Sequence, residues 1–266
     1  MQTYRYWHKE SAEIRIDGTT RAIVCWGRSN ASAEEARNNA LARAGKVQKK
    51  LRGEDVVKED YSADIREQLV REIDAHNVIT RNRYGALVLN TDSTTIIDID
   101  QHRKTFLEKL GFAKRDNKAA ILDELGNLAS RPEYRDIGLR TYETAKGVRV
   151  IVSGAYYDPN GQDGRVLLER CNADPVFSLL CRKQNCYRAR LTPKPYRIKH
   201  KGMRYRWPME PQAIETAKAW IREYEVKSEN YAICRYLETF GRQAPAAGII
   251  ALHDEATRAA SRLPLA

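Results

Sequence analysis

The sequence predicts an α+β fold, and three observations support this prediction. Short β-rich runs lie close together along the chain and are joined by turn signals, a pattern typical of antiparallel hairpins. Segments with one apolar stripe at helical spacing lie between and after these runs. The 266 residues are 42% hydrophobic, enough to build a packed core. Mixed helices and hairpins favour the α+β class.

The first elements form a ββα unit, which we assign to residues 1–57. Two extended segments within residues 2–27 are joined by an Asp-Gly turn signal at 17–18. Ser and Asn side chains at 29–32 can cap a helix that begins near Ala33 and ends at Gly53. Alanines at every fourth position give this helix its apolar stripe. A unit of this size buries little core alone.

We assign residues 58–210 to a central α+β core and residues 211–266 to a helical segment packed on it. A helix over 63–76 is predicted from Ile65, Leu69 and Ile73, which are spaced for burial. The β-rich runs are residues 84–90, 94–99, 139–144 and 148–153. Helices are predicted over 102–110, 118–130, from 166, from 175 and over 211–224, with further helical segments to the end.

The net charge is concentrated in one stretch. The chain has 46 Lys and Arg against 35 Asp and Glu, a formal charge of +11. Residues 181–206 hold ten of these basic residues and no acidic residue. Aromatic residues, among them Tyr187, lie within the same stretch. Cations neutralise phosphates and aromatic rings stack on bases, so the stretch predicts nucleic-acid or nucleotide binding. A solvated strand edge is the alternative. The candidate nucleic-acid-binding residues are Arg197, Lys199, Lys201, Arg204, Tyr196 and Tyr205.

Asp98 and Asp100 form the sharpest local motif. They end an apolar run, and residues i and i+2 of a strand face the same side. Two carboxylates on one face can hold Mg²⁺ or Mn²⁺ against substrate phosphates. Alternatively, the two aspartates face water or pair with a nearby arginine, for which Arg81, Arg83 and Arg103 are candidates.

The order of these features resembles the catalytic core of the archaeo-eukaryotic primase family, the primase-polymerases. The strand ending in Asp98 and Asp100 is followed by a helical stretch, a β-turn-β with Gly147, and a basic strand with Lys194. The resemblance covers about residues 78–205 and implies a mixed or antiparallel RRM-like sheet flanked by helices. It also implies that Asp98 and Asp100 are catalytic, metal-binding residues.

In that family a small-x-His motif contacts the nucleotide phosphate, and a third motif contributes an acidic residue. Here Arg149 stands at the place of the His, and the third acidic residue has no convincing match; Asp158 and Asp174 are nearest in order. An arginine can still bind phosphate. The implied nucleotide- or phosphate-binding residues are Arg149, Lys146, Arg188, Arg190 and Lys194.

Two functions from different classes remain open. The first is metal-dependent nucleotidyl transfer with Mg²⁺ or Mn²⁺ and a nucleoside triphosphate, as in DNA replication. The second is a non-catalytic nucleic-acid-binding protein or an assembly subunit related to mobile elements, replication or defence. Cys171, Cys181, Cys186 and His200 suggest zinc only weakly, because their spacing is irregular. No run is long and apolar enough for a membrane span, so we expect a reduced, cytoplasmic protein with no membrane partner.

Overall fold

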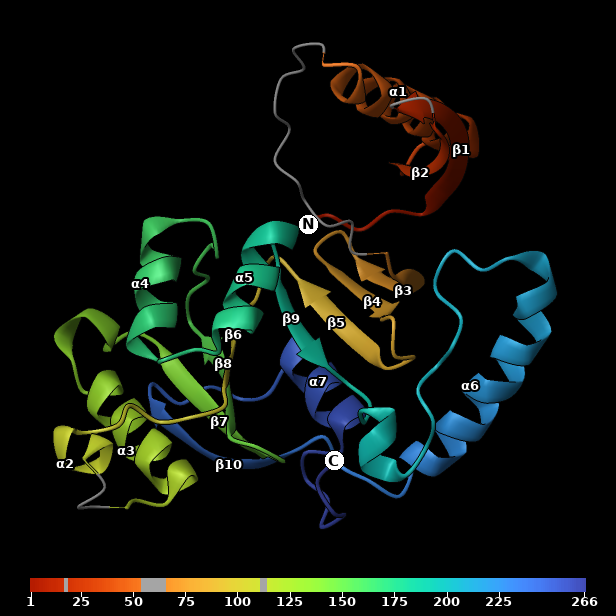
Figure 1. The fold of residues 1–266 in the computed structure, drawn as a ribbon. Coiled ribbons are helices and arrows are strands. Elements are labelled where there is room, and N and C mark those ends of the chain that lie inside the picture. The colour runs from red at the N-terminus through yellow and green to blue at the C-terminus, as the bar shows by residue number, and fades with distance from the viewer. Residues whose placement is uncertain (17–18, 54–65, 111–113) are drawn as a thin grey trace. The chain divides into compact units, whose positions relative to one another are not determined.

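A computed structural model describes residues 1–16, 19–53, 66–110 and 114–266, and the chain divides into two compact units (Figure 1). The first unit is Thr3–Leu69, and the second is Met1–Gln2 with Val70–Ala266. Residues 211–266, assigned from the sequence to a separate segment, belong to the second unit. The described strands pair in antiparallel sheets and helices accompany them, so the predicted α+β class is confirmed.

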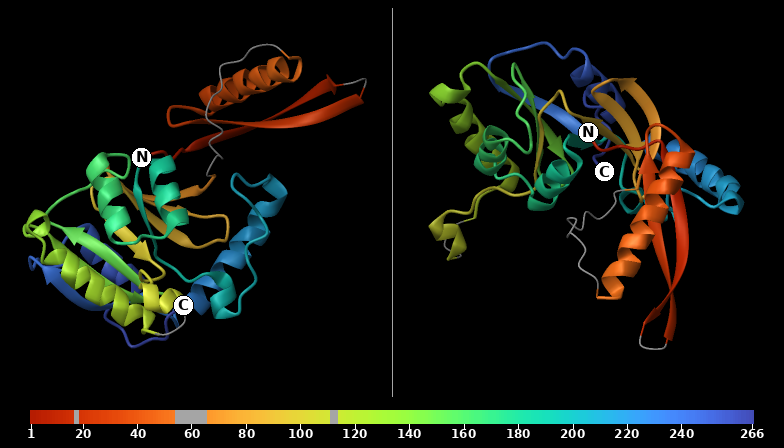
Figure 2. Two further views of the ribbon diagram at one scale, coloured as in Figure 1. Left: turned by 60° about the vertical axis from the view of Figure 1, so that its left-hand side comes forward. Right: turned by 90° about the horizontal axis from the view of Figure 1, so that it is seen from above.

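The first unit has the predicted ββα order. Strands β1 (Tyr6–Ile16) and β2 (Thr19–Ser29) form a two-stranded antiparallel ribbon, and α1 (Ala33–Leu51) follows. Figure 2 shows α1 lying along one face of this ribbon. The helix begins after Ser32, whose side chain accepts a hydrogen bond from the Glu35 backbone N–H. Its alanine stripe is buried, as the spacing predicted.

Gly27 lets β2 and α1 approach each other closely. A Cβ added at Gly27 would lie 1.9 Å from the Ala36 carbonyl oxygen and 2.3 Å from the Ala40 nitrogen. Only glycine therefore fits at this contact. Small residues on both elements bring the two backbones together, and Ala36 and Ala40 are fully buried there.

The second unit contains two four-stranded sheets. The strand order of the first is β10-β7-β8-β6, and the order of the second is β3-β4-β5-β9. The first sheet consists of β6 (Ile96–Ile99), β7 (Gly138–Thr144), β8 (Val148–Ser153) and β10 (Cys234–Gly241). The second consists of β3 (Gln68–Asp74), β4 (Asn77–Arg81), β5 (Leu87–Thr91) and β9 (Tyr187–Arg190).

The two sheets meet where β9 contacts β6. The chain runs from β6 through α3 (Asn117–Ala129) to the β7–β8 hairpin, and then through α4 (Gln162–Arg170) and α5 (Pro175–Gln184) to β9. From β6 to β9 the order along the chain is strand-helix-strand-strand-helix-strand. β7, β8 and β6 are adjacent in the first sheet, and β9 contacts β6 from the second sheet. β10 extends the first sheet on its other side.

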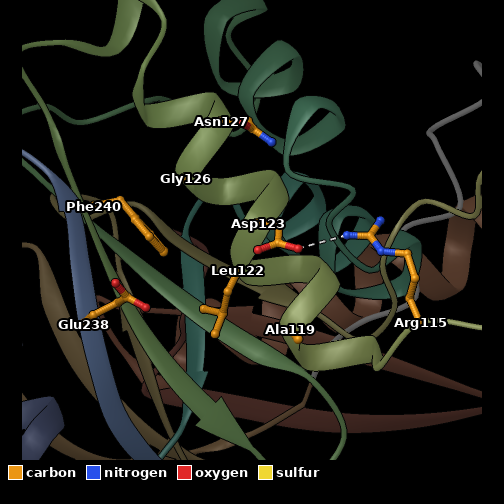
Figure 3. Close-up of a pocket in the computed structure, with 8 residues that line it drawn as sticks. All are labelled: Arg115, Ala119, Leu122, Asp123, Gly126, Asn127, Glu238 and Phe240. Carbon is orange, nitrogen blue, oxygen red and sulfur yellow. Dashed lines mark hydrogen bonds and ion pairs between the residues drawn. The ribbon is translucent and has the colours of Figure 1, made fainter.

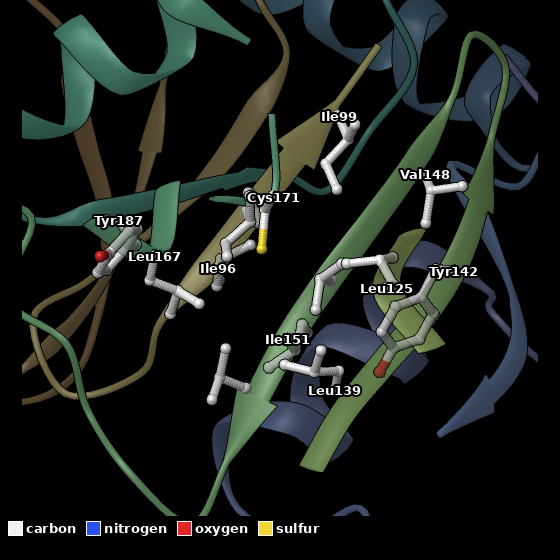
Figure 4. Close-up of a cluster of buried hydrophobic side chains, with 14 of the residues drawn as sticks. Ile96, Ile99, Leu125, Leu139, Tyr142, Val148, Ile151, Leu167, Cys171 and Tyr187 are labelled. Atoms are coloured by element: carbon white, nitrogen blue, oxygen red, sulfur yellow. The ribbon is translucent and has the colours of Figure 1, made fainter. Parts of the chain in front are cut away.

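Two helices cover opposite faces of the first sheet. Lys118 of α3 forms a 2.7 Å ion pair with Glu143 of β7, while His253 of α7 (Ile249–Thr257) contacts the ring of the neighbouring residue, Tyr142. Because neighbouring residues of a strand point to opposite faces, α3 and α7 lie on different sides. The interior between them holds the main apolar core, part of which Figure 4 shows. The remaining helices are α2 (Phe106–Lys109) and α6 (Ile214–Ser228).

Two sequence predictions of helix are wrong. Residues 68–74 of the predicted helix 63–76 form strand β3, and residues 63–65 lie outside the described residues. Leu69 and Ile73 are four residues apart, a spacing that places side chains on one face in a strand as well as in a helix. Residues 234–241, expected among the C-terminal helical segments, form β10. Among the described residues no helix is long and apolar enough to cross a membrane.

Candidate anion-binding site

Asp98, Arg149 and Tyr142 form one row across the first sheet. Asp98 of β6 lies opposite Arg149 of β8, and Arg149 lies opposite Tyr142 of β7. The Arg149 guanidinium donates through Nε to Asp98 Oδ1 at 2.7 Å and through Nη2 to Oδ2 at 3.2 Å. The Arg149 side chain is 2% exposed and that of Asp98 is 30% exposed. The sequence-based alternative partners of Asp98 do not make this contact; Arg149 does.

Both groups keep their charge in this pair. Burial raises the pKa of Asp98, but the charge and hydrogen bonds of Arg149 outweigh it and hold that pKa below its usual value. Burial likewise lowers the pKa of Arg149, and Asp98 more than compensates, so the pKa is raised. The pair is a two-point, charge-assisted contact inside the unit.

His253 completes the surroundings of Arg149. Arg149 Nη1 donates to the Arg190 carbonyl oxygen at 3.1 Å and lies 3.2 Å from His253 Nε2. A guanidinium can only donate, so Nε2 accepts and Nδ1 carries the proton, which it donates to Asp254 Oδ1 at 3.1 Å. Burial, together with the charge of Arg149, lowers the pKa of His253. His253 is therefore a neutral, fully buried imidazole.

Asp254 extends this network to β7. Its Oδ2 accepts a 2.8 Å hydrogen bond from Arg140 Nη2, and Arg140 Nε donates to the Tyr142 hydroxyl at 2.7 Å. Sequence analysis did not find His253, Asp254 or Arg140. Their only sequence signal is a His-Asp pair within an apolar C-terminal helix, which by itself indicates no chemistry.

The side chains at Asp98 and Asp100 fit a resident divalent cation poorly. Both oxygens of Asp98 accept hydrogen bonds from Arg149, and Asp100 Oδ2 lies 4.0 Å from Lys146 Nζ. Within the described residues, no three His, Cys, Asp or Glu side chains come together as a possible metal site. A metal at Asp98 would have to displace Arg149 from both carboxylate oxygens.

Four cations lie together beside this row, and we call Lys146, Arg190, Lys194 and Arg197 the cationic cluster. Arg190 ends β9, and Lys146 lies in the β7–β8 turn. Lys194 directly precedes the short 3₁₀ helix Pro195–Ile198, and Arg197 belongs to it. Burial and then the charges of Arg190, Arg197 and Lys146 lower the pKa of Lys194. These side chains are therefore close enough to repel one another.

Arg190 is the most constrained member of the cluster. Burial, with the charges of Arg149 and Arg197, lowers its pKa to about 10. Its Nε atom is buried and makes no hydrogen bond to any described residue. The carboxylate whose charge acts on Arg190, that of Asp98, is already paired with Arg149. A half-buried guanidinium among like charges and without a carboxylate of its own is costly unless an anion joins it.

Tyr196 stands next to the cluster with its ring in solvent. The residue is 67% exposed. Burial opposes ionisation of its hydroxyl, but a hydrogen bond from Arg197 and the charges of Lys194, Arg197 and Lys146 together outweigh it and lower the pKa. The arrangement offers an exposed aromatic face beside several cations.

A pocket of about 550 Å³ opens on the other side of Lys146. Asp100 and His102 line it together with further cations; the complete lining is Asp100, Gln101, His102, Lys104, Glu108, Lys114, Arg115, Asn117 and Lys146. His102 Nε2 lies 2.8 Å from Glu108 Oε1, and Nδ1 lies 3.0 Å from Asn117 Oδ1. Both partners are acceptors, because the Asn117 Oδ1 atom also accepts from the His102 backbone N–H. The His102 ring therefore donates from both nitrogens and is a further cation of this pocket. Its pKa is raised, mainly by the hydrogen bond to Asn117 and next by the one to Glu108.

The remaining predicted residues are spread along the basic stretch. Arg188 donates to the Gln184 side chain, and Lys199, Lys201 and Arg204 are exposed while Tyr205 is half-buried. Tyr187 is fully buried, so it is not available for stacking. His200 and the cysteines considered as zinc ligands are buried too, and burial raises the pKa of Cys171 to about 12. A separate groove between α3 and β10, lined by Leu122 and Phe240 among others, contains none of the predicted site residues (Figure 3).

No protein-family model, no curated protein and no solved structure matches this chain. The resemblance to primase-polymerases therefore stays a prediction based on the motif residues, and the candidate site depends on its own geometry.

Proposed function

We propose that this protein binds the phosphate groups of a nucleic acid or a nucleotide at the cationic cluster. The observation that carries the proposal is Arg190, a half-buried residue among like charges whose buried Nε makes no hydrogen bond to any described residue. A bound phosphate would offset the repulsion among Arg190, Lys194 and Arg197.

The chemistry of the neighbours favours a nucleotide phosphate over a simple anion. Guanidinium groups bind phosphate oxygens through two parallel hydrogen bonds, and the cluster contains two of them. The exposed ring of Tyr196 lies beside them and offers a face on which a base can stack. The cations lining the pocket beyond Lys146 continue the positive surface past Asp100.

The test is binding of a fluorescein-labelled single-stranded 12-mer, measured by anisotropy, with a nucleoside triphosphate as competitor. The double variant Lys194→Glu with Arg197→Glu should bind at least tenfold more weakly. Its salt slope should be about 1.4 shallower, because two phosphate contacts are lost. The matched control is Lys183→Glu with Arg131→Glu, two exposed positions outside the cluster with the same change of charge. Equal affinities for both variants would remove the support for this site.

Metal-dependent nucleotidyl transfer is the second candidate function. The position of Asp98 and Asp100 at the end of β6, with Lys146 beside Asp100, favours it. The pair between Asp98 and Arg149 opposes it, because a catalytic metal needs those oxygens. Incubation with Mg²⁺ or Mn²⁺, a primed template and labelled nucleoside triphosphates tests it. Incorporation that Asp100→Ala abolishes would support transfer, and no incorporation by the unaltered protein would restrict the function to binding.

A further inference from the structure

The two aspartates that the sequence predicts as metal ligands each face a cation of the β7–β8 hairpin. Arg149 donates to both carboxylate oxygens of Asp98, at 2.7 and 3.2 Å. Lys146 Nζ lies 4.0 Å from Asp100 Oδ2. Asp98 belongs to β6 and Asp100 follows its last residue, so one hairpin brings positive charge to both carboxylates at the same strand end.

The turn of this hairpin is held against the end of β6 through its backbone. A Cβ added at Gly147 would lie 2.0 Å from the Ile99 carbonyl oxygen and 2.9 Å from the Asp100 Cα atom, so only glycine permits the contact. Asn117 Nδ2 donates to the Asp100 carbonyl oxygen at 2.9 Å and lies 3.5 Å from that of Lys146. The position of Lys146 beside Asp100 therefore follows from the fold of the turn and not only from the side chains.

Arg149 is fixed in its place by the rest of its surroundings. Its side chain is 2% exposed, and its Nη1 atom donates to the Arg190 carbonyl oxygen at 3.1 Å and lies 3.2 Å from His253 Nε2. Moving the guanidinium aside for a divalent cation would leave these buried acceptors and the Asp98 carboxylate without their donors, which is costly. Arg149 is therefore the standing counter-charge of Asp98 in the folded unit.

The other cations of the cluster keep their positive charge for a ligand. Arg190 is half-buried, and its buried Nε makes no hydrogen bond to any described residue. Burial lowers the pKa of Lys194, and the charges of the other three members of the cluster lower it further. A phosphate at this place would meet positive charge supplied by the protein alone. A Mg²⁺ ion chelated by the same phosphates would cancel part of their negative charge and add a cation among like charges.

We infer that the cationic cluster binds a nucleoside triphosphate in its metal-free form, and that Mg²⁺ opposes this binding. The β7–β8 hairpin already provides the positive charge that a divalent ion would bring to the two aspartates. The inference rests on the proposed function, because it specifies which form of the ligand occupies the same site. A compact polyphosphate fits better than a strand, since the four cations gather at one place whereas the phosphates of a strand are spread along it.

The experiment measures the anisotropy of a fluorescein-labelled nucleoside triphosphate as the full chain is added, once in EDTA and once in excess Mg²⁺. Sodium chloride keeps the ionic strength of the two conditions equal, so that general screening does not contribute. Binding should be about fivefold weaker in Mg²⁺ than in EDTA, because the complexed triphosphate carries less negative charge.

Asp100→Asn separates the two ways of balancing charge at this strand end. The change removes the carboxylate beside Lys146, so it should tighten binding in EDTA about twofold, whereas the loss of a metal ligand would weaken binding in Mg²⁺. The matched control is Asp136→Asn, which makes the same charge change at an exposed residue beside the opposite end of β7 from the turn. This control should leave the affinity unchanged, and a thermal melt of each variant checks that it is folded.

Three results would overturn the inference and leave the proposed function in place. These are triphosphate binding in Mg²⁺ that EDTA abolishes, equal affinity in Mg²⁺ and in EDTA, and binding of the labelled 12-mer but not of the triphosphate. Binding that Asp100→Asn weakens in Mg²⁺ but not in EDTA would overturn it as well, because Asp100 would then hold a metal. Failure of both the triphosphate and the 12-mer to bind under either condition would instead remove the proposed function itself.

Discussion

Arg149 of β8 donates hydrogen bonds to both carboxylate oxygens of Asp98 on β6, at 2.7 and 3.2 Å, and the Arg149 side chain is 2% exposed. The pair joins two neighbouring strands of the first sheet, and His253 and the Arg190 carbonyl satisfy the remaining nitrogen of the guanidinium. A residue that the sequence predicts to bind phosphate is thus fully occupied inside the protein. Its electrostatic role in this arrangement is to neutralise Asp98, the carboxylate whose charge also acts on Arg190.

Removing the charge of Asp98 should destabilise the second unit. Asp98→Asn leaves the buried guanidinium of Arg149 without a counter-ion, and breaking such a pair costs about 3 kcal/mol. Urea unfolding measures the change. Asp123→Asn is the matched control, because Asp123 pairs with Arg115 at 3.1 Å but is 70% exposed and should cost under about 1 kcal/mol.

The double variant Asp98→Asn with Arg149→Met tests whether the cost comes from the unpaired charge. Removing both charges should restore part of the stability that Asp98→Asn loses. If the double variant is as unstable as the sum of the two single variants, the pair is not coupled and the interpretation is wrong.

Mn²⁺ should bind weakly in the absence of a nucleotide. Arg149 occupies both oxygens of Asp98, so a cation must displace a charge-assisted pair before it reaches them. Titration calorimetry should show no dissociation constant below the millimolar range for the unaltered protein. A micromolar site that Asp98→Ala removes would contradict this prediction and favour nucleotidyl transfer.

Two histidines should titrate in opposite directions from the ordinary value of 6.5. The pKa of His253 is lowered by burial and by Arg149, whereas that of His102 is raised by its bonds to Asn117 and Glu108. Histidine side-chain NMR spectra recorded across a pH series would show His253 changing below 6.5 and His102 above it. Both changing at 6.5 would contradict the assigned tautomer and charge.

The same shifts set the pH dependence of stability. Below pH 6.5 His253 becomes protonated in the unfolded chain but stays neutral in the folded protein, so the free energy of unfolding falls with acidification. His253→Gln should flatten this part of the stability profile. His102 acts in the opposite sense: its contribution is complete below 6.5 and is lost as the pH rises through its raised folded pKa. Urea midpoints at several pH values measure both effects.

Lys194 should react unusually fast with amine reagents, and phosphate ligands should protect it. Burial and the charges of Arg190, Arg197 and Lys146 lower its pKa, which increases the fraction of free amine at pH 8. A bound phosphate favours the charged form, so a nucleoside triphosphate should slow acetylation of Lys194. Peptide mass spectrometry measures the rate against exposed Lys183 as a reference, and equal rates with and without the nucleotide would count against the cluster as its binding site.

Local patterns predicted the fold class and two hairpins, β1–β2 and β7–β8, because these depend on residues close in the sequence. The β3–β4–β5 pairing was missed, and the predicted runs 84–90 and 94–99 correspond to β5 and β6, which belong to different sheets. The β7–β8 hairpin and the α1 stripe follow directly from spacing. The strand β10 was missed because its pairing with β7 joins segments at least 90 residues apart, and its exposed edge shows little alternation. The local spacing of Leu69 and Ile73 suits a helix and a strand equally.

The contacts within the candidate site, like the pairing of β10, join segments far apart in the sequence and could not be predicted from local patterns. The sequence identified Asp98, Arg149, Arg190 and Lys194 as charged residues of interest, but it assigned Asp98 to a metal and Arg149 to a phosphate. Their direct pairing depends on the register of β6 against β8. His253 approaches from a helix 104 residues further along the chain, and no local pattern reports such a contact.

Gly27 should be the most sensitive small residue of the first unit. In Gly27→Ala the new methyl group would lie 1.9 Å from the Ala36 carbonyl oxygen, a contact with backbone that no side-chain rotation relieves. The helix must then move off the ribbon, which exposes the buried alanine stripe and should cost several kcal/mol, about 2–4. Gly45→Ala is the matched control, since nothing lies within 4 Å of its added Cβ and Gly45 is inside α1. That change should stabilise the helix by about 0.5–1 kcal/mol. Hydrogen exchange of the α1 amides measures both effects, and equal protection in the two variants would show that β2 and α1 do not meet at Gly27.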